Sequence, residues 1–129
     1  MSTQSANESS QIYRIDKFKV PSSARQEFVD RVHRTHEFLR TLPGFIQDTV
    51  LEQTDGPGEF NFVTIVIWAN TEAIEAARKA VTAKYEETGF NPQEMLARLG
   101  IKADLANYQQ IEERPGTETD LAYYTQVEA

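Results

Sequence analysis

The only two histidines of the chain, His33 and His36, are the residues best suited to acid–base chemistry. An imidazole titrates near neutral pH, so it can accept and return a proton under physiological conditions. Both lie in the segment 22–42, whose apolar residues recur at helical spacing. At about 100° per residue, His36 borders the apolar stripe of Phe28 and Val32, whereas His33 points towards solvent. His36 is therefore the candidate general base or hydrogen-bond donor of a pocket; a partly buried structural imidazole is the alternative.

Two histidines three residues apart could also bind one metal ion from a shared helix face. The sequence offers no clear third ligand, so no metal site is predicted. The chain contains no cysteine, which excludes thiolate metal sites, iron–sulfur clusters, disulfides and thiol nucleophiles. It also lacks a glycine-rich phosphate loop, a G-x-S-x-G elbow and an H-E-x-x-H motif, so nothing indicates a kinase or a hydrolase.

Three further side chains could line a pocket beside His36. Trp68, the only tryptophan, ends an apolar run and could stack on a planar substrate or simply pack beneath a helix. Arg78 and Tyr85 lie in the segment 71–88, at the edge and on the inner face of a predicted helix. Arg78 could stabilise an anionic phenolate, although most such arginines extend into water. Tyr85 could belong to the core or to a pocket wall.

Alternating strands and helices must position these side chains. β-forming residues end at Pro21, and Ser22 or Ser23 can cap a helix that Pro43-Gly44 stops. The cluster DGPGE at 55–59 predicts the turn of an antiparallel hairpin. The predicted order is strand, helix, strand, strand, helix, short helix and strand, over residues 11–20, 22–42, 45–54, 60–69, 71–88, 91–100 and 102–113.

The short helix at 91–100 has a full set of end signals. Asn91 can cap its start, with Pro92 at the first helical position. Glu94 can close a capping box, and Gly100 follows the last turn. These signals fix the position of the short helix closely.

Four strands with two long helices on one face form the ferredoxin-like α+β arrangement, βαββαβ, here with an extra short helix before the last strand. The helices cover only one face of such a sheet. The strand at 60–69 is nevertheless apolar on both faces, since from Phe62 to Trp68 only Thr64 is polar. We therefore expect the second face to be covered by the sheet of a second copy, giving a dimeric α/β-barrel. A smaller apolar patch covered by the C-terminal arm is the alternative.

The composition is that of one globular domain with polar ends. The chain has 129 residues, 40% of them hydrophobic. We expect a disordered arm at 1–10, a folded domain at 11–112 and an acidic tail at 113–129. The net charge of −7 disfavours nucleic acid and anionic membranes as partners. The polar start lacks a signal-peptide pattern and no apolar run spans a bilayer, so a cytoplasmic location is expected.

Three short motifs, in this order, resemble the antibiotic biosynthesis monooxygenase family. They are TLPGF at 41–45 after the first helix, the Trp that ends VTIVIW at 63–68, and the helix start NTEA at 70–73. The resemblance spans about residues 11–112. It implies a dimeric α/β-barrel with a ferredoxin-like protomer and a small pocket between sheet and helices in each protomer.

The resemblance also implies an activity. Several members of that family oxidise phenols or quinols with O₂ and without metal or flavin, and others degrade haem. For this chain it implies a cofactor-free monooxygenase acting on a small aromatic substrate. His36 and Arg78 are then the predicted catalytic residues, and Phe62, Trp68 and Tyr85 the predicted substrate contacts.

The chain departs from the family pattern at three places. Members often carry an acidic residue two positions before the strand-terminal Trp, where this chain has Val66. Haem-degrading members use a His on the second long helix and an Asn on the first strand; segment 71–88 has no His and segment 11–20 has no Asn. Two alternatives therefore stay open. One is a non-catalytic protein that binds small molecules in the same pocket; the other, which the last two departures disfavour, is a haem-degrading enzyme.

Overall fold

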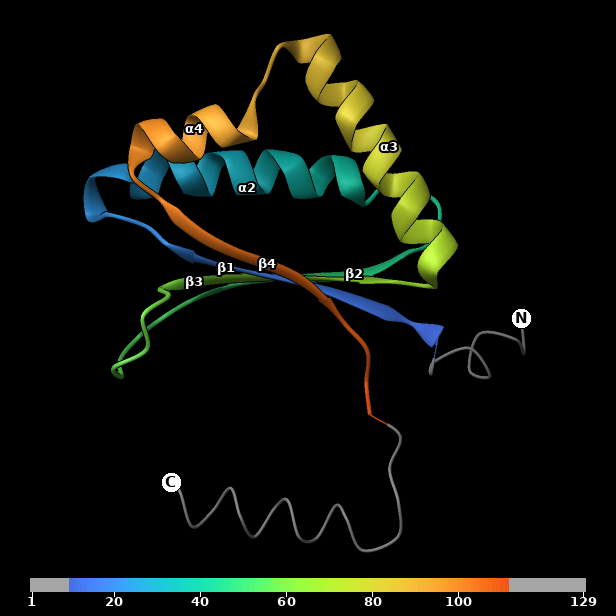
Figure 1. The fold of residues 1–129 in the computed structure, drawn as a ribbon, viewed down its shortest axis with the longest axis horizontal. Helices are drawn as coiled ribbons and strands as arrows, with labels where there is room; N and C mark the ends of the chain where they lie inside the picture. The colour runs from blue at the N-terminus through green and yellow to red at the C-terminus, as the bar shows by residue number, and fades with distance from the viewer. Residues whose placement is uncertain (1–9, 112–129) are drawn as a thin grey trace, which may run out of the picture.

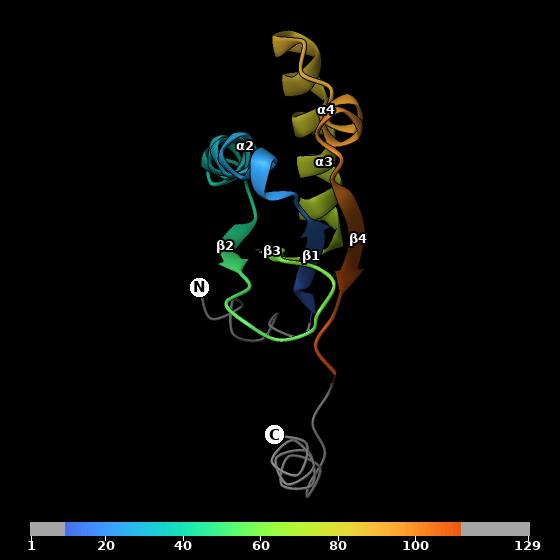
Figure 2. The same cartoon turned by 90° about the vertical axis from the view of Figure 1, so that its left-hand side faces the viewer.

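The computed structural model describes residues 10–111, in which helices cover one face of a four-stranded sheet (Figures 1 and 2). The elements are β1 (Ile12–Lys19), the 3-10 helix η2 (Ser22–Ala24), α2 (Arg25–Leu39), β2 (Phe45–Glu52), β3 (Phe62–Trp68), α3 (Thr71–Thr88), α4 (Pro92–Leu99) and β4 (Lys102–Tyr108). All strand pairs are antiparallel, in the order β2-β3-β1-β4. The predicted ferredoxin-like fold with an extra short helix is confirmed. The predicted tail at 113–129 lies outside the described residues, and so does the predicted arm at 1–10 except for Ser10.

Two of the three helices begin and end as the sequence predicts. Asn70 caps α3 by accepting the backbone N–H of Ala73 at 2.8 Å, and Gly89 ends it with φ 76°. Asn91 caps α4 by accepting the N–H of Glu94 at 3.0 Å, and Gly100 ends it with φ 71°. Both glycines occupy the left-handed region, which other residues adopt only with strain.

The start of α2 differs from the prediction. Ser22 and Ser23 do not cap the helix; they form the 3-10 turn η2, in which the N–H of Ala24 donates to the Pro21 carbonyl at 2.9 Å. Ala24 occupies the cap position of α2 without a side-chain hydrogen bond. The serine cap was wrong because Ala24 is itself buried, at 3% exposure, in the core beneath α2.

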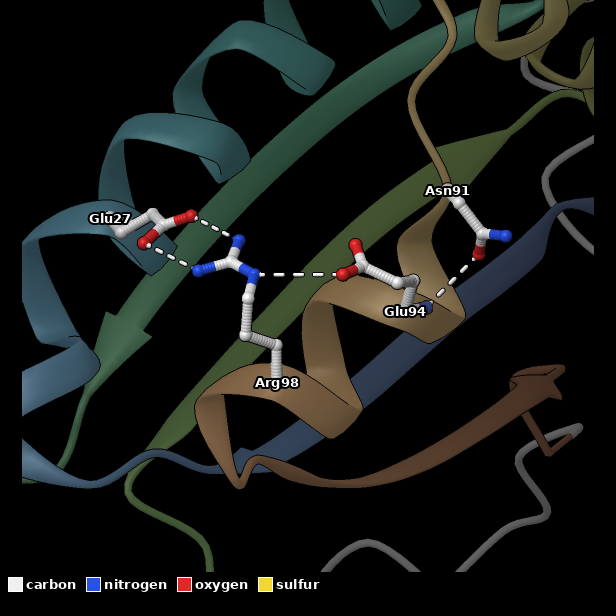
Figure 3. A network of polar contacts seen from close by, with 4 residues as sticks. All are labelled: Glu27, Asn91, Glu94 and Arg98. Atoms are coloured by element: carbon white, nitrogen blue, oxygen red, sulfur yellow. Dashed lines mark hydrogen bonds and ion pairs between the residues drawn. The ribbon is translucent and has the colours of Figure 1, made fainter.

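The side chains between sheet and helices form two apolar clusters. One lies beneath α2 and α4 and contains Val20, Ala24, Phe28, Val32, Phe62, Met95 and Ile101. The other lies beneath the start of α3 and contains Ile12, Val66, Trp68, Ile74 and Ala77. Arg98 ties α4 to α2, because its Nη2 lies 2.6 Å from Glu27 Oε2 (Figure 3). The first cluster also borders the site described below, through Phe28, Val32 and Met95.

The other face of the sheet bears no described helix (Figure 1). It is apolar at its centre, where Ile15, Ile65 and Ile67 lie, and carries polar and charged residues towards its edges. We define this open face by the alternation of the paired strands as Tyr13, Ile15, Lys17, Lys19, Gln47, Thr49, Leu51, Val63, Ile65, Ile67, Lys102, Asp104, Ala106 and Tyr108. Leu51 is 48% exposed and Tyr108 is 44% exposed. The second copy expected to cover this face stays a prediction.

Within residues 10–111, no helix is long and apolar enough to span a lipid bilayer. The cytoplasmic location stays a prediction.

Candidate functional site

A cavity of about 770 Å³ lies between the covered face of the sheet and helices α2, α3 and α4. This volume is in the range of pockets that bind small organic molecules. Aromatic and aliphatic side chains line much of it, among them Phe18, Phe28, Met95 and Leu105. Its polar wall is formed by Arg14, Asp16, Arg31, His36, Thr64 and Arg78.

His36 stands on the cavity wall at the end of α2, with only 4% of its surface exposed. Its Nδ1 lies 3.0 Å from Asp48 Oδ2 on β2. Arg40, one turn further along the chain, donates to the same oxygen from Nε at 3.1 Å, and its Nη2 lies 2.9 Å from that oxygen in an ion pair. Asp48 therefore orients the imidazole of His36, and Arg40 in turn orients the carboxylate of Asp48.

A β-bulge brings Asp48 to this position. The pairing of β2 with β3 shifts between Phe45 and Gln47, so that Ile46 is an extra residue in β2. Phe45 and Asp48 consequently face the helices together, although strict alternation would place them on opposite faces. Without the bulge, the carboxylate would lie on the open face and His36 would lose its partner.

These contacts fix which nitrogen of His36 can accept a proton. Burial alone would raise the pKa of Asp48, but the hydrogen bonds from Arg40 and His36 outweigh it and keep the pKa below its usual value. An ionised carboxylate only accepts hydrogen bonds, so Nδ1 of His36 carries the proton and Nε2 has the free lone pair. Burial lowers the pKa of His36, with the charges of Arg40 and His33 adding to it and Asp48 opposing it in part. A neutral imidazole with a free Nε2 is suited to act as a base.

Asp16 places a second proton acceptor on the same wall. It faces the helices from β1, where its Oδ1 accepts from Arg14 Nε at 2.7 Å. Arg14 also donates from Nη1 to Asn107 Oδ1 at 3.4 Å. Burial raises the pKa of Asp16, and the charge and hydrogen bond of Arg14 offset this only in part. The floor of the cavity thus carries an ion pair beside the imidazole.

The outer wall of the cavity is formed by Arg31, Tyr85 and Phe90. The guanidinium carbon of Arg31 lies 3.6 Å from the centroid of the Phe90 ring. The rings of Phe90 and Tyr85 meet edge to face at 5.1 Å and 72°. Arg78 also lines the cavity, but its Nη1 donates to both carboxylate oxygens of Glu75 at 3.1 and 3.2 Å, and its side chain is 52% exposed.

Of the residues predicted for the site, His36, Arg78 and Tyr85 line one cavity. Phe62 and Trp68 are each 3% exposed and do not border it. Phe62 packs against Phe28, with ring centroids 5.1 Å apart, in the cluster beneath α2 and α4. Trp68 packs edge to face on Phe45 at 5.8 Å in the other cluster. Sequence reasoning missed Asp48, Arg14 and Arg31 and left the orientation of Asp16 undecided.

His33 is exposed and lies apart from the cavity. In the described part of the chain, no group of three or more His, Asp or Glu side chains is placed to hold a metal ion.

The sequence model of the family described as antibiotic biosynthesis monooxygenase matches residues 11–84, which is more than half of the chain. The chain belongs to the antibiotic biosynthesis monooxygenase family. The resemblance noted from its motifs is therefore confirmed. Comparison with curated protein sequences gives no match.

Solved structures share the fold of this family member. SnoaB, a cofactor-independent oxygenase from Streptomyces nogalater, is 24% identical with a TM-score of 0.59, over 82% of this chain and 98% of that one. The heme-degrader MhuD from Mycobacterium tuberculosis is 21% identical with a TM-score of 0.59, over 80% of this chain and 98% of that one. A conserved protein from Methanosarcina mazei Go1 is 15% identical with a TM-score of 0.59, over 83% of this chain and 99% of that one. At these identities the likeness shows the fold alone.

Proposed function

We propose that this protein is a cofactor-independent monooxygenase that oxidises a small aromatic phenol or quinol with O₂. Membership of the antibiotic biosynthesis monooxygenase family supports an oxygenase. The observation that carries the proposal is the buried His36 on the wall of the cavity, with Nδ1 held 3.0 Å from Asp48 and Nε2 free. A base of this kind is what an oxygenase needs when the substrate must become a phenolate before it reacts with O₂.

In the proposed reaction, Nε2 of His36 accepts the phenolic proton. The phenolate supplies electrons to O₂, one oxygen atom bonds to a ring carbon, and the O–O bond breaks with the second oxygen leaving as water. A phenol and O₂ thus give a quinone and water, and the substrate itself is the reductant. The protein contributes position and electrostatic stabilisation rather than an electron carrier.

Two residues of α3 complete the proposed site. Tyr85 is half-buried and lines the cavity, so its hydroxyl can donate to a negatively charged substrate oxygen. Arg78 lines it as well and adds positive charge, reduced by its bond to Glu75. Phe62 and Trp68 support the cavity from the core and have no proposed contact with the substrate.

Oxygen consumption with a panel of hydroquinones and hydroxynaphthoquinones tests this function. A His36→Ala variant should lose turnover by roughly a hundredfold or more, the usual contribution of a positioned general base. His33→Ala is the matched control, because His33 is exposed on the same helix, and it should keep the wild-type rate. If no compound in the panel is consumed above the buffer rate, the function is wrong for that panel. Undiminished turnover by His36→Ala would remove His36 from the mechanism.

The same cavity supports a second function, binding without chemistry. Its walls are largely aromatic and aliphatic, and His36 is the only imidazole among the described residues that line it. A binding protein needs no more than that. Native mass spectrometry of freshly purified protein separates the two functions: an aromatic ligand that survives aerobic incubation unchanged indicates binding only.

Haem degradation does not fit the residues present. The family resemblance places the iron ligand on the second long helix, and the residues of α3 that line the cavity are Arg78, Thr82, Tyr85 and Glu86. The cavity imidazole belongs instead to α2 and is hydrogen-bonded to Asp48. Adding haemin should therefore give no Soret band of a histidine-ligated haem.

We also propose that two copies of the chain associate through the open face. Ile15, Ile65 and Ile67 lie side by side on it, from the two central strands β1 and β3. The face of an antiparallel sheet that meets water normally carries polar side chains at its centre, so an apolar centre favours a covering partner. Sedimentation of the full chain should therefore report about twice the 14.7 kDa monomer mass.

A further inference from the structure

Among the described residues, three arginines line the cavity, and two of them already have a carboxylate partner. Arg14 is paired with Asp16 at 2.7 Å. Arg78 is paired with Glu75 at 3.1 Å. The contacts of the described residues include no ion pair and no hydrogen bond for the side chain of Arg31. The cavity therefore contains one cation whose counter-charge is not supplied by residues 10–111.

Arg31 is nevertheless held in a defined position. Its guanidinium carbon lies 3.6 Å from the centroid of the Phe90 ring, at stacking distance. Phe90 is fixed in turn by the edge-to-face contact with Tyr85 at 5.1 Å. Asn91, the next residue, caps α4 by accepting the N–H of Glu94 (Figure 3). This cap fixes the backbone directly after Phe90. Stacking occupies a face of the guanidinium and leaves the N–H groups at its edge free to donate.

The surroundings of Arg31 would favour an anion. Burial lowers the pKa of Arg31, and the charge of Arg34, one turn away, adds to that effect; Tyr85 opposes it. Glu86 also lies on the cavity wall, but it is exposed and forms no described ion pair with Arg31. A carboxylate on a ligand would supply the missing charge and accept two parallel hydrogen bonds from the guanidinium fork.

We infer that the cavity takes an aromatic molecule with a carboxylate at one end, bound by Arg31 beside Phe90 and Tyr85, and a hydroxyl at the other end near His36. The place of the hydroxyl rests on the proposed function of His36. Arg31 and His36 are five residues apart on α2, about 7.5 Å along the helix axis and about 140° around it, and both line the cavity. The cavity of about 770 Å³ has room for two fused aromatic rings with substituents at opposite ends. The ligand class is therefore a hydroxylated aromatic carboxylic acid.

Calorimetric titration under nitrogen tests this inference without requiring turnover. The probes are 6-hydroxy-2-naphthoate and the uncharged 6-hydroxy-2-naphthamide, which has nearly the same shape. Wild-type protein should bind the acid at least roughly tenfold more tightly than the amide, the usual gain from a charge-assisted hydrogen bond. Arg31→Gln should abolish that preference and leave the amide affinity unchanged. Arg34→Gln removes a neighbouring exposed charge that does not line the cavity, and it should keep the preference.

Several outcomes would overturn the inference. These are a wild-type protein that binds neither probe or binds both equally, and an Arg31→Gln variant that keeps the preference. Equal losses of acid and amide affinity in Arg31→Gln would show that Arg31 only supports the cavity wall. Oxygen consumption is scored separately. A preference for the acid that depends on Arg31, without turnover, contradicts the monooxygenase and supports the carboxylate site. Turnover without that preference supports the monooxygenase and contradicts the carboxylate site.

Discussion

At the scale of residues, burial and one carboxylate oxygen of Asp48 act on the charge state of His36 in opposite directions. Nδ1 of His36 and two nitrogens of Arg40 all lie within 3.1 Å of Asp48 Oδ2. The carboxylate favours the imidazolium, whereas Arg40 and burial disfavour it. Because burial is the largest of these effects, His36 stays neutral further into the acid range than an exposed histidine. A proposed base gains from this, since it must be neutral to accept a proton.

Asp48→Asn should lower the pKa of His36 further. The substitution removes the negative charge that favours the imidazolium and leaves the opposing charge of Arg40 in place. Activity that requires neutral His36 rises as the pH passes upward through its pKa, so the acid limb of the kcat/KM profile should move to lower pH. The plateau rate should fall as well, because a weaker base accepts a proton less readily. An NMR titration of the His36 ring checks the pKa independently of turnover.

Arg40→Gln should shift the pKa of His36 in the opposite direction to Asp48→Asn. It removes a cation that disfavours the imidazolium, so the pKa of His36 should rise and the acid limb should move to higher pH. The two variants thus predict shifts of opposite sign around one pair of side chains. Movement of both limbs in the same direction, or of neither, would show that Asp48 and Arg40 do not set the charge state of His36.

The sequence reveals these residues only in part. Helical spacing was enough to place His36 at the border of the buried stripe of α2, where it lies. Asp48 could not be found in the same way, because alternation from Phe45 puts it on the wrong face and the bulge at Ile46 has no clear sequence signal. Arg31 was missed because its partner, the Phe90 ring, comes from a distant part of the chain.

At the scale of elements, Gly44 in the loop between α2 and β2 packs against the first turn of α3. Gly44 follows Pro43 in the TLPGF motif and has φ 82°. Its carbonyl accepts the N–H of Ala69 at 2.8 Å. A Cβ at this position would collide with the Cβ of Ala73 in the first turn of α3. Both the backbone angle and the close approach therefore require glycine here.

Gly44→Ala should destabilise the protein by about 2–4 kcal/mol. About 1–2 kcal/mol comes from the left-handed backbone, and the collision with Ala73 adds a further penalty of about the size of an overpacked core. Urea unfolding followed by circular dichroism measures the loss.

Gly56→Ala separates the two contributions. Gly56 has φ 102°, but a Cβ there would meet no atom within 4 Å. It should therefore cost only the backbone part, about 1–2 kcal/mol. Adding Ala73→Gly to Gly44→Ala should recover stability, because it removes the atom with which the new methyl collides. A double variant less stable than the sum of its single losses would contradict the steric explanation.

Element order and helix ends were the most predictable features of the fold. The Asn caps of α3 and α4 and their terminal glycines are local signals, and the structure confirms them. The start of α2 was not predictable from Ser22 and Ser23, because the burial of Ala24 against the core decided the conformation there. Local hydrogen-bonding preference gave way to tertiary packing at that point.

At the scale of the molecule, β1 contributes side chains both to the cavity and to the open face of the sheet. Arg14 and Asp16 point into the cavity, while Tyr13 and Ile15 belong to the open face. The proposed association of two copies and the proposed chemistry therefore use opposite faces of one sheet. Each protomer has its cavity between its own sheet and helices, so association should support the sheet without completing the site.

Ile65→Lys tests this division. Ile65 lies in the middle of the open face, paired with Ile15 and Thr49, so a lysine there would be buried without a partner between two sheets. Burying an unpaired charge costs several kcal/mol, and the variant should sediment as a 14.7 kDa monomer. Ala76→Lys, on the exposed side of α3, should keep the wild-type mass.

Because the cavity lies on the opposite face of the sheet, monomeric Ile65→Lys should keep its affinity for 6-hydroxy-2-naphthoate within a few-fold. A dimeric Ile65→Lys, or a monomeric wild type, would contradict the association, and a monomer without affinity would show that the two faces are coupled.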